Sequence, residues 1–147
     1  VMLDNVLAGN IARQEAAAQA ADVGIATAFA ELQSLVDTDA PAAGWYFPTP
    51  LAEDADGLPD VPDWDAAREL PVGRFEVRFV VERVCRTTPV TDGLQQCLMS
   101  EPAPGLRNAK SGEQAVLVPA QRTYRATVHV TGPKNTSSWA QALLTRP

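Results

Sequence analysis

One long amphipathic segment constrains the fold of this chain more than any other feature. Between Leu3 and Val36, apolar side chains recur at steps of three and four residues, which keeps them on one face of a helix. These positions are Leu3, Leu7, Ile11, Ala18, Ala21, Ile25, Ala28, Phe29, Leu32 and Leu35. Charged residues such as Asp22 and Glu31 fall largely on other faces. The pattern predicts one helix over residues 3–36 that packs along a single stripe.

The predicted helix is much longer than a typical globular helix. Residues 3–36 at about 1.5 Å each span roughly 51 Å, whereas globular helices average about 11 to 12 residues. Its charges exclude a membrane span, and its alanine-rich middle lacks the large seam residues of a coiled coil. The small residues instead allow another helix or a sheet to approach the helix backbone closely. Because strands cross a helix at an angle, we expect part of the stripe to extend beyond the sheet of its own domain.

Side-chain size divides the stripe into two parts. The larger residues near its C-terminal end are expected in the core between helix and sheet; they are Ile25, Phe29, Leu32 and Leu35. The remaining positions are assigned to an assembly helix that contacts partners, namely Leu3, Leu7, Ile11, Ala18 and Ala21. Gly9 and Gly24 each cost about 1 kcal/mol relative to alanine inside a helix. Either close packing offsets this cost, or the two glycines are tolerated on an exposed face.

Only the far end of the helix has a clear terminator. Pro41 disfavours helical geometry at Ala40, whereas Asp4 at the near end could cap the first turn but follows apolar residues 1–3. Two interpretations stay open. An apolar segment precedes this sequence in the full gene product, or the helix begins here with a frayed turn.

The acidity of the chain is concentrated in one segment. Residues 37–65 hold eight acidic residues and neither Lys nor Arg, so the charge of this segment is −8. Because the net charge of the chain is −6, the remaining residues together carry +2. A pI near 4.7 argues against nucleic-acid binding by the chain as a whole. Proline and glycine punctuate residues 37–73, which predicts a mostly irregular connector held on the sheet by its aromatic residues. The acids between Asp54 and Asp65 match a calcium loop poorly, because position 65 is not glutamate, and a solvated loop is favoured.

Strict alternation predicts two strands. Arg74–Val84 places Phe75, Val77 and Phe79 on one face, and Gln121–Thr131 places Tyr124 and Val128 on one face. Thr136–Leu144 should return antiparallel to complete a hairpin, and residues 115–118 should form a short edge strand. One long helix followed by about four antiparallel strands is an α+β architecture. We therefore expect a single domain with a helix (3–36), a connector (37–73) and a sheet with a cysteine loop (74–147).

Two cysteines, Cys85 and Cys97, flank a turn-rich stretch that suits folding back. A single pair lacks the four ligands of a zinc site, so we expect a disulfide. Closing this 13-residue loop would stabilise the fold by about 3 kcal/mol on the chain-entropy estimate. A disulfide implies an oxidising compartment, and two unpaired buried thiols are the alternative.

Catalytic chemistry finds little support in the sequence. The single histidine, His129, lies on the polar face of its strand without a neighbouring nucleophile or carboxylate motif. We assign no catalytic residue, no cofactor and no metal site. Arg74, Arg78, Arg122 and Arg125 could form a basic stripe for DNA or another partner, but interleaved glutamates favour ordinary ion pairs. Trp139 is expected to cover the core or the sheet edge; a ligand platform is the alternative.

The ordered set of motifs resembles the minor pilins of type IV pili of the PilX kind. These motifs are Ala8-Gly9-Asn10, the small-residue run Gln14–Gly24, Trp45-Tyr46, the cysteine pair around Pro89–Asp92, and the segment Tyr124–Thr136 with Gln141 near the end. The leader and apolar segment of such pilins lie outside this sequence. The cysteines depart from the pattern of major pilins, where they bracket a C-terminal loop.

The resemblance implies a non-enzymatic subunit of a fimbrium that takes part in pilus assembly. Such a subunit sits in the inner membrane with its domain in the periplasm, and then enters the extracellular pilus in a priming or tip complex. Its implied partners are other minor pilins and the major pilin, with a tip adhesin as a further candidate. The alternative hypothesis is a surface-binding or cell-adhesion module that uses the connector or the outer sheet face to recognise an adhesin, a surface or DNA.

Overall fold

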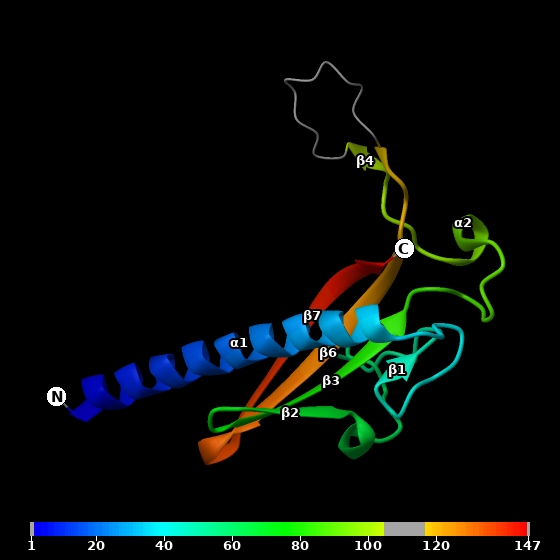
Figure 1. Ribbon diagram of the computed structural model, residues 1–147. Coiled ribbons are helices and arrows are strands. Elements are labelled where there is room, and N and C mark those ends of the chain that lie inside the picture. The colour runs from blue at the N-terminus through cyan, green and yellow to red at the C-terminus, as the bar shows by residue number, and fades with distance from the viewer. Residues whose placement is uncertain (1, 105–116, 147) are drawn as a thin grey trace, which may run out of the picture.

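The protein packs one long helix across one face of a five-stranded sheet (Figure 1). The computed structural model describes residues 2–104 and 117–146. The helix is α1 (Met2–Ser34), and the sheet runs in the order β1 (Tyr46–Phe47), β3 (Phe75–Arg83), β6 (Arg122–Gly132) and β7 (Thr136–Arg146), with β2 (Arg68–Val72) also paired to β3. The predicted α+β class is therefore confirmed.

The sheet is mixed, which corrects the expectation of a purely antiparallel one. Strands β3, β6 and β7 are antiparallel neighbours and match the predicted segments closely, and the turn η3 (Pro133–Asn135) joins β6 to β7. Strand β1 instead runs parallel to β3, with Tyr46 beside Val81. Strands β1 and β2 both lie within the connector that was expected to be mostly irregular.

Smaller elements lie at the end of the sheet away from the N-terminus of α1 (Figure 1). They are α2 (Gly93–Gln96), β4 (Ala103–Pro104) and β5 (Leu117–Val118), and β4 pairs with β5 in a separate two-stranded ladder. The strand expected over residues 115–118 is thus present at Leu117–Val118, and residues 115–116 lie outside the described residues. The expected disulfide joins Cys85 to Cys97.

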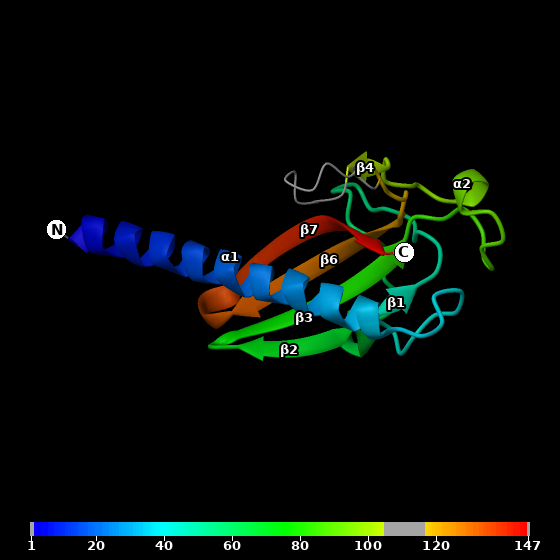
Figure 2. The same cartoon turned by 45° about the horizontal axis from the view of Figure 1, so that its top comes forward.

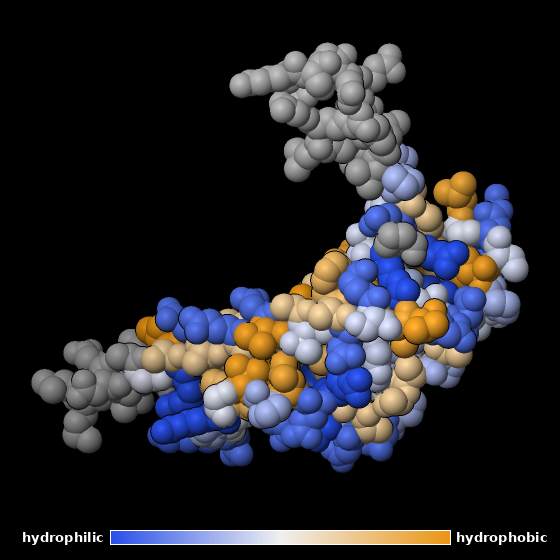
Figure 3. Space-filling model, viewed as in Figure 1, coloured by the Kyte–Doolittle hydropathy of each residue, from blue (hydrophilic) through white to orange (hydrophobic). Residues whose placement is uncertain are grey.

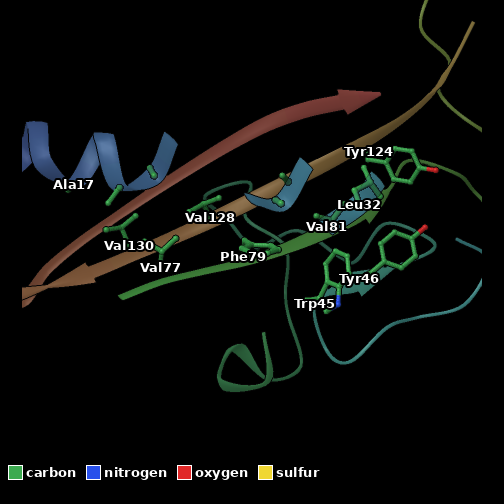
Figure 4. Packing of buried hydrophobic residues seen from close by; sticks show 14 residues of the cluster. Ala17, Leu32, Trp45, Tyr46, Val77, Phe79, Val81, Tyr124, Val128 and Val130 are labelled. Atoms are coloured by element: carbon green, nitrogen blue, oxygen red, sulfur yellow. The ribbon is translucent and has the colours of Figure 1, made fainter. Parts of the chain in front are cut away.

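Small residues make the contact between α1 and the sheet. The buried helix positions are Ala17, Ala20, Ala21, Gly24, Ala28 and Leu32. They face the buried side chains Val77, Phe79, Val81, Tyr124, Ala126, Val128 and Val130 of β3 and β6 (Figure 4). A Cβ atom on Gly24 would lie 2.7 Å from Val77 Cγ1, so close packing explains this glycine. Among the described residues, no atom lies within 4 Å of a Cβ atom built on Gly9, which is exposed.

The expected core is right except at one helix position. Leu32 is buried, and Ile25, Leu35 and Phe75 are partly buried against the same cluster. The assignment of Phe29 to the core is wrong, because its side chain remains 44% exposed. The face of α1 that meets the sheet is set by the alanines and Gly24, which permit the closest approach, and this turns Phe29 away from the sheet.

The connector covers the far face of the sheet, so both faces of β3 are buried. Val61 and Ala67 pack on Val80, with Phe47, Leu51 and the 3-10 helix η1 (Trp64–Ala66) around them. Anchoring of the connector by aromatic residues is therefore confirmed. Trp45 and Tyr46 differ, because they pack in the core on the α1 side of the sheet (Figure 4).

Candidate assembly surface

The N-terminal half of α1 projects beyond the sheet (Figure 2). Ala17 is the first buried side chain among those described along the helix. At 1.5 Å per residue, residues 2–16 therefore extend the helix by about 22 Å on the N-terminal side of Ala17. An isolated helix of this length is marginal in water. The projecting part of α1 is consequently where a partner would stabilise the protein most.

A groove of about 720 Å³ lies where the helix leaves the sheet. One wall is α1, and the other is formed by the β2–β3 turn and by the start of η3. Val72 and Phe75, which flank the turn, line the groove together with Ala12, Ala16 and Val23 of the helix, so the lining is largely apolar. Apolar surface gathers beside the middle of α1, next to strongly hydrophilic residues (Figure 3).

Three basic residues rim this groove: Arg13 on α1, Arg74 in the β2–β3 turn, and Lys134 in η3. Both turns are tight, because Gly73 has a φ of +58° and Lys134 a φ of +56°. Glycine adopts this left-handed geometry without steric cost. The groove thus combines an apolar floor with positive charge, which suits an amphipathic partner that carries acidic residues.

The outward face of α1 offers a second contact surface. Ile11 is 50% exposed, and Phe29 and Ala18 are exposed on the same side of the helix. Acidic Glu15 and Asp22 lie among them and are also exposed. This face therefore has the opposite charge to the rim of the groove.

The structure separates the predicted assembly-helix residues. Ile11 and Ala18 are exposed, whereas Ala21 is 4% exposed and packs on the protein's own sheet. The assignment of Ala21 to a partner surface is therefore wrong, because its position on the helix faces β3 and β6. Leu3 and Leu7 lie on α1, but their side chains are outside the described residues. The groove itself was missed, since its turns lie far from the helix in sequence.

A second exposed apolar site lies at the opposite end of the molecule (Figure 1). The disulfide-closed loop carries Leu94, which is 76% exposed, and Leu98, which directly follows the loop, is also exposed. A shallow cavity of about 400 Å³ lies beside the disulfide and is lined by Pro50, Val84 and Leu98 among others.

A buried arginine ties this end of the molecule together. Arg83 is fully buried and donates from Nε to the Pro48 carbonyl at 3.1 Å. Its Nη1 donates to Asp39 Oδ1 at 2.8 Å, and its Nη2 donates to Thr88 Oγ1 at 3.3 Å. The Val90 amide also donates to Asp39 Oδ1. Together with the arginine, this amide holds the pKa of the Asp39 carboxyl below its usual value.

Ion pairs neutralise two arginines of the expected basic stripe. Arg78 pairs with Glu76 at 2.7 Å, and Arg125 pairs with the buried Glu82 at 2.9 Å and also with Glu53. Glu82 in turn accepts a hydrogen bond from the Leu51 amide at 2.7 Å. These bonds hold the acidic connector against the sheet. Within residues 2–104 and 117–146, no cluster of three potential metal ligands occurs.

An aromatic cluster covers the far face near β7. The His129 ring stacks on Trp139 with centroids 3.8 Å apart and planes within 7°. Trp64 of the connector meets Trp139 edge-on at 5.3 Å. Burial lowers the pKa of His129, whose Nε2 lies 2.9 Å from Ser137 Oγ. Trp139 therefore packs on the far face of the sheet against His129 and Trp64, and its side chain remains 39% exposed.

Comparison with protein-family models, with curated proteins and with solved structures gave no match to this chain. None of the helices in the described part of the chain combines the length and apolar composition needed to cross a membrane.

Proposed function

We propose that this protein is a non-enzymatic minor pilin that takes part in the assembly of a type IV pilus. In this role the full-length protein is anchored in the inner membrane before assembly, with this domain in the periplasm, and α1 then packs against the major pilin and other minor pilins. The projecting half of α1, beside a groove with a basic rim, is the observation that carries the proposal. The choice of the pilin family rests on the resemblance of the sequence motifs between Ala8 and Gln141 that is described in the sequence analysis.

The physical support is that α1 exposes contact surfaces its own sheet does not cover. Ile11 lies on the projecting part, and the outward face mixes apolar residues with Glu15 and Asp22. The groove of a neighbouring subunit provides apolar lining and basic residues in return. Charge complementarity of this kind fixes orientation and excludes wrong partners more than it adds affinity.

Two aspartate substitutions on α1 test the proposal in cells that assemble the pilus. Ile11→Asp places a charge on the projecting half, and Gln33→Asp is the matched control at an exposed position beside the sheet. Both isolated variants should unfold within about 0.5 kcal/mol of the wild type, because both sites are exposed. Only Ile11→Asp should reduce the number of surface pili counted by electron microscopy.

Two results would reject this role. Normal piliation with Ile11→Asp would show that the projecting face is not used in assembly. Equal loss of pili with Gln33→Asp would show that any charge on the helix is disruptive, and the projecting half would then have no special part.

Adhesion is a second candidate, favoured by the exposed Leu94 and Leu98 at the end distant from the N-terminus of α1. If this loop binds a surface or a tip adhesin, Leu94→Asp should lower adherence of the cells while leaving the number of pili unchanged. Unchanged adherence would remove this candidate.

A further inference from the structure

Strand β7 is a sheet edge without the usual protection against pairing. It is the terminal strand of the sheet, and no other strand within the described residues pairs with its outer side. It is 11 residues long. Over 136–145 it contains no Lys, Arg, Asp, Glu or Pro. Natural sheets normally blunt an exposed edge with short strands, charges or proline, because unpaired backbone groups attract other strands.

The opposite edge of the same sheet shows these protective features. Strand β1 has two residues, and β2 has five, including Arg68, Glu69 and Pro71. One edge of the sheet is thus protected, and the other is long and uncharged. This contrast within one sheet indicates that the edge at β7 is suited to receive a partner strand.

Two exposed apolar side chains of β7 could contact the side chains of such a partner strand. Trp139 is 39% exposed and Leu143 is 66% exposed. They lie four residues apart, so they point to the same side of the sheet with Gln141 between them. Cross-strand pairs of aromatic and aliphatic residues stabilise antiparallel strands.

We propose that β7 pairs antiparallel with β7 of a second copy of this chain, about a two-fold axis at Gln141. In this register Trp139 lies opposite Leu143 of the second copy, and Leu143 lies opposite its Trp139. Ala140 lies opposite Ala142 on the other face, and no like charges meet. The two sheets join into one continuous sheet, with both copies of α1 on the same face.

The other symmetric registers on this face fit less well. An axis at Trp139 places Leu143 opposite position 135, which precedes β7, and an axis at Leu143 places Trp139 opposite position 147, which follows it. Only the axis at Gln141 places Trp139 of each copy opposite Leu143 of the other. The contact involves one strand from each copy, so it belongs with small, transient interfaces. This dimer does not depend on the proposed pilin function.

Sedimentation velocity from about 10 µM to about 1 mM tests the dimer, since this range covers weak association. Gln141→Lys places two lysines opposite each other at the axis, and Gln141→Glu does the same with two carboxylates. Each should weaken the dimer about fivefold, because like charges directly opposite are destabilising. An equimolar mixture should restore it through Lys–Glu pairing. Gln33→Lys, a matched change on exposed α1, should leave the dimer unchanged.

The side-chain amide of Gln141 donates to Thr127 Oγ1 at 3.1 Å, so a substitution at this position could also disturb the fold. A second variant at another position therefore tests the dimer independently. Leu143→Lys alters an exposed side chain and removes both Trp139–Leu143 pairs, so it should weaken the dimer at least as much. A protein that stays monomeric at about 1 mM overturns the proposal. A dimer unaffected by Leu143→Lys, or a lysine–glutamate mixture no tighter than its components, overturns it as well.

Discussion

Replacing Gly24 by alanine tests how closely α1 approaches the sheet. The added Cβ atom would lie 2.7 Å from Val77 Cγ1 and 2.8 Å from Val128 Cγ1, and both valines are fully buried. Carbon atoms that are not bonded to one another essentially never come this close in proteins, so the helix or the two valines must shift. Because interiors are close-packed, neither can move without disturbing further contacts.

Two opposing effects set the size of the change. Overpacking of this kind costs about 1 to 3 kcal/mol, whereas alanine is favoured over glycine inside a helix by about 1 kcal/mol. The free energy of unfolding should therefore fall by about 1 kcal/mol. Gly9→Ala is the matched control, because nothing lies within 4 Å of the added Cβ atom. It should leave stability unchanged or raise it by up to about 1 kcal/mol.

Urea unfolding followed by circular dichroism, with the disulfide intact, measures both variants. For a urea dependence of about 2 kcal/mol per molar, Gly24→Ala should lower the midpoint by about 0.5 M. Gly9→Ala should not lower it. If Gly24→Ala instead raised the midpoint, as helix propensity alone predicts, the close approach of helix and sheet would be wrong.

Three further predictions concern single side chains. Leu32→Ala should cost about 2 to 5 kcal/mol of unfolding free energy and Phe29→Ala less than about 1 kcal/mol, because only the leucine is buried; equal midpoints in urea would contradict this. The pKa of Asp39 is lowered from 3.8, so its contribution to stability is present above that pH and is lost as pH falls through the lowered value. Asp39→Asn should therefore flatten the loss of stability between pH 4 and pH 2, measured by thermal unfolding, and an unchanged slope would exclude this role. The pKa of the single histidine, His129, is lowered by burial from 6.5, so an NMR titration should give a midpoint below 6.5 that rises in Trp139→Ala; a midpoint at or above 6.5 would contradict its burial.

Local sequence patterns were sufficient to predict the elements that have one face in the core. Alternation identified β3, β6 and β7 because their inward residues, such as Val77 and Val128, are apolar at every second position. The same logic failed for β2, whose sequence Arg68–Val72 contains charges and proline and forms a strand only because β3 lies beside it. Alternation also gave no sign that the connector would bury Val80 and Glu82 on the far face.

The candidate site was predictable only where it follows from length. A helix much longer than the sheet must project, and it does. Its contact face was misjudged at Phe29 because side-chain size was taken to indicate burial, whereas alanines and Gly24 set the approach. The groove depends on Gly73 and Lys134 coming next to α1. That juxtaposition is a property of the whole fold and leaves no local pattern in the sequence.

The buried Arg83 also constrains the order in which the chain can fold. Its bonds to Pro48, Thr38 and Asp39 span 35 to 45 residues of sequence, whereas that to Thr88 spans five. Closing such long loops is entropically costly, and the contacts repay that cost only when they form together. The end of β3 therefore reaches its final environment only when residues 38–48 are in place around it. Until then the guanidinium favours water, which disfavours collapsed intermediates that bury this strand end prematurely.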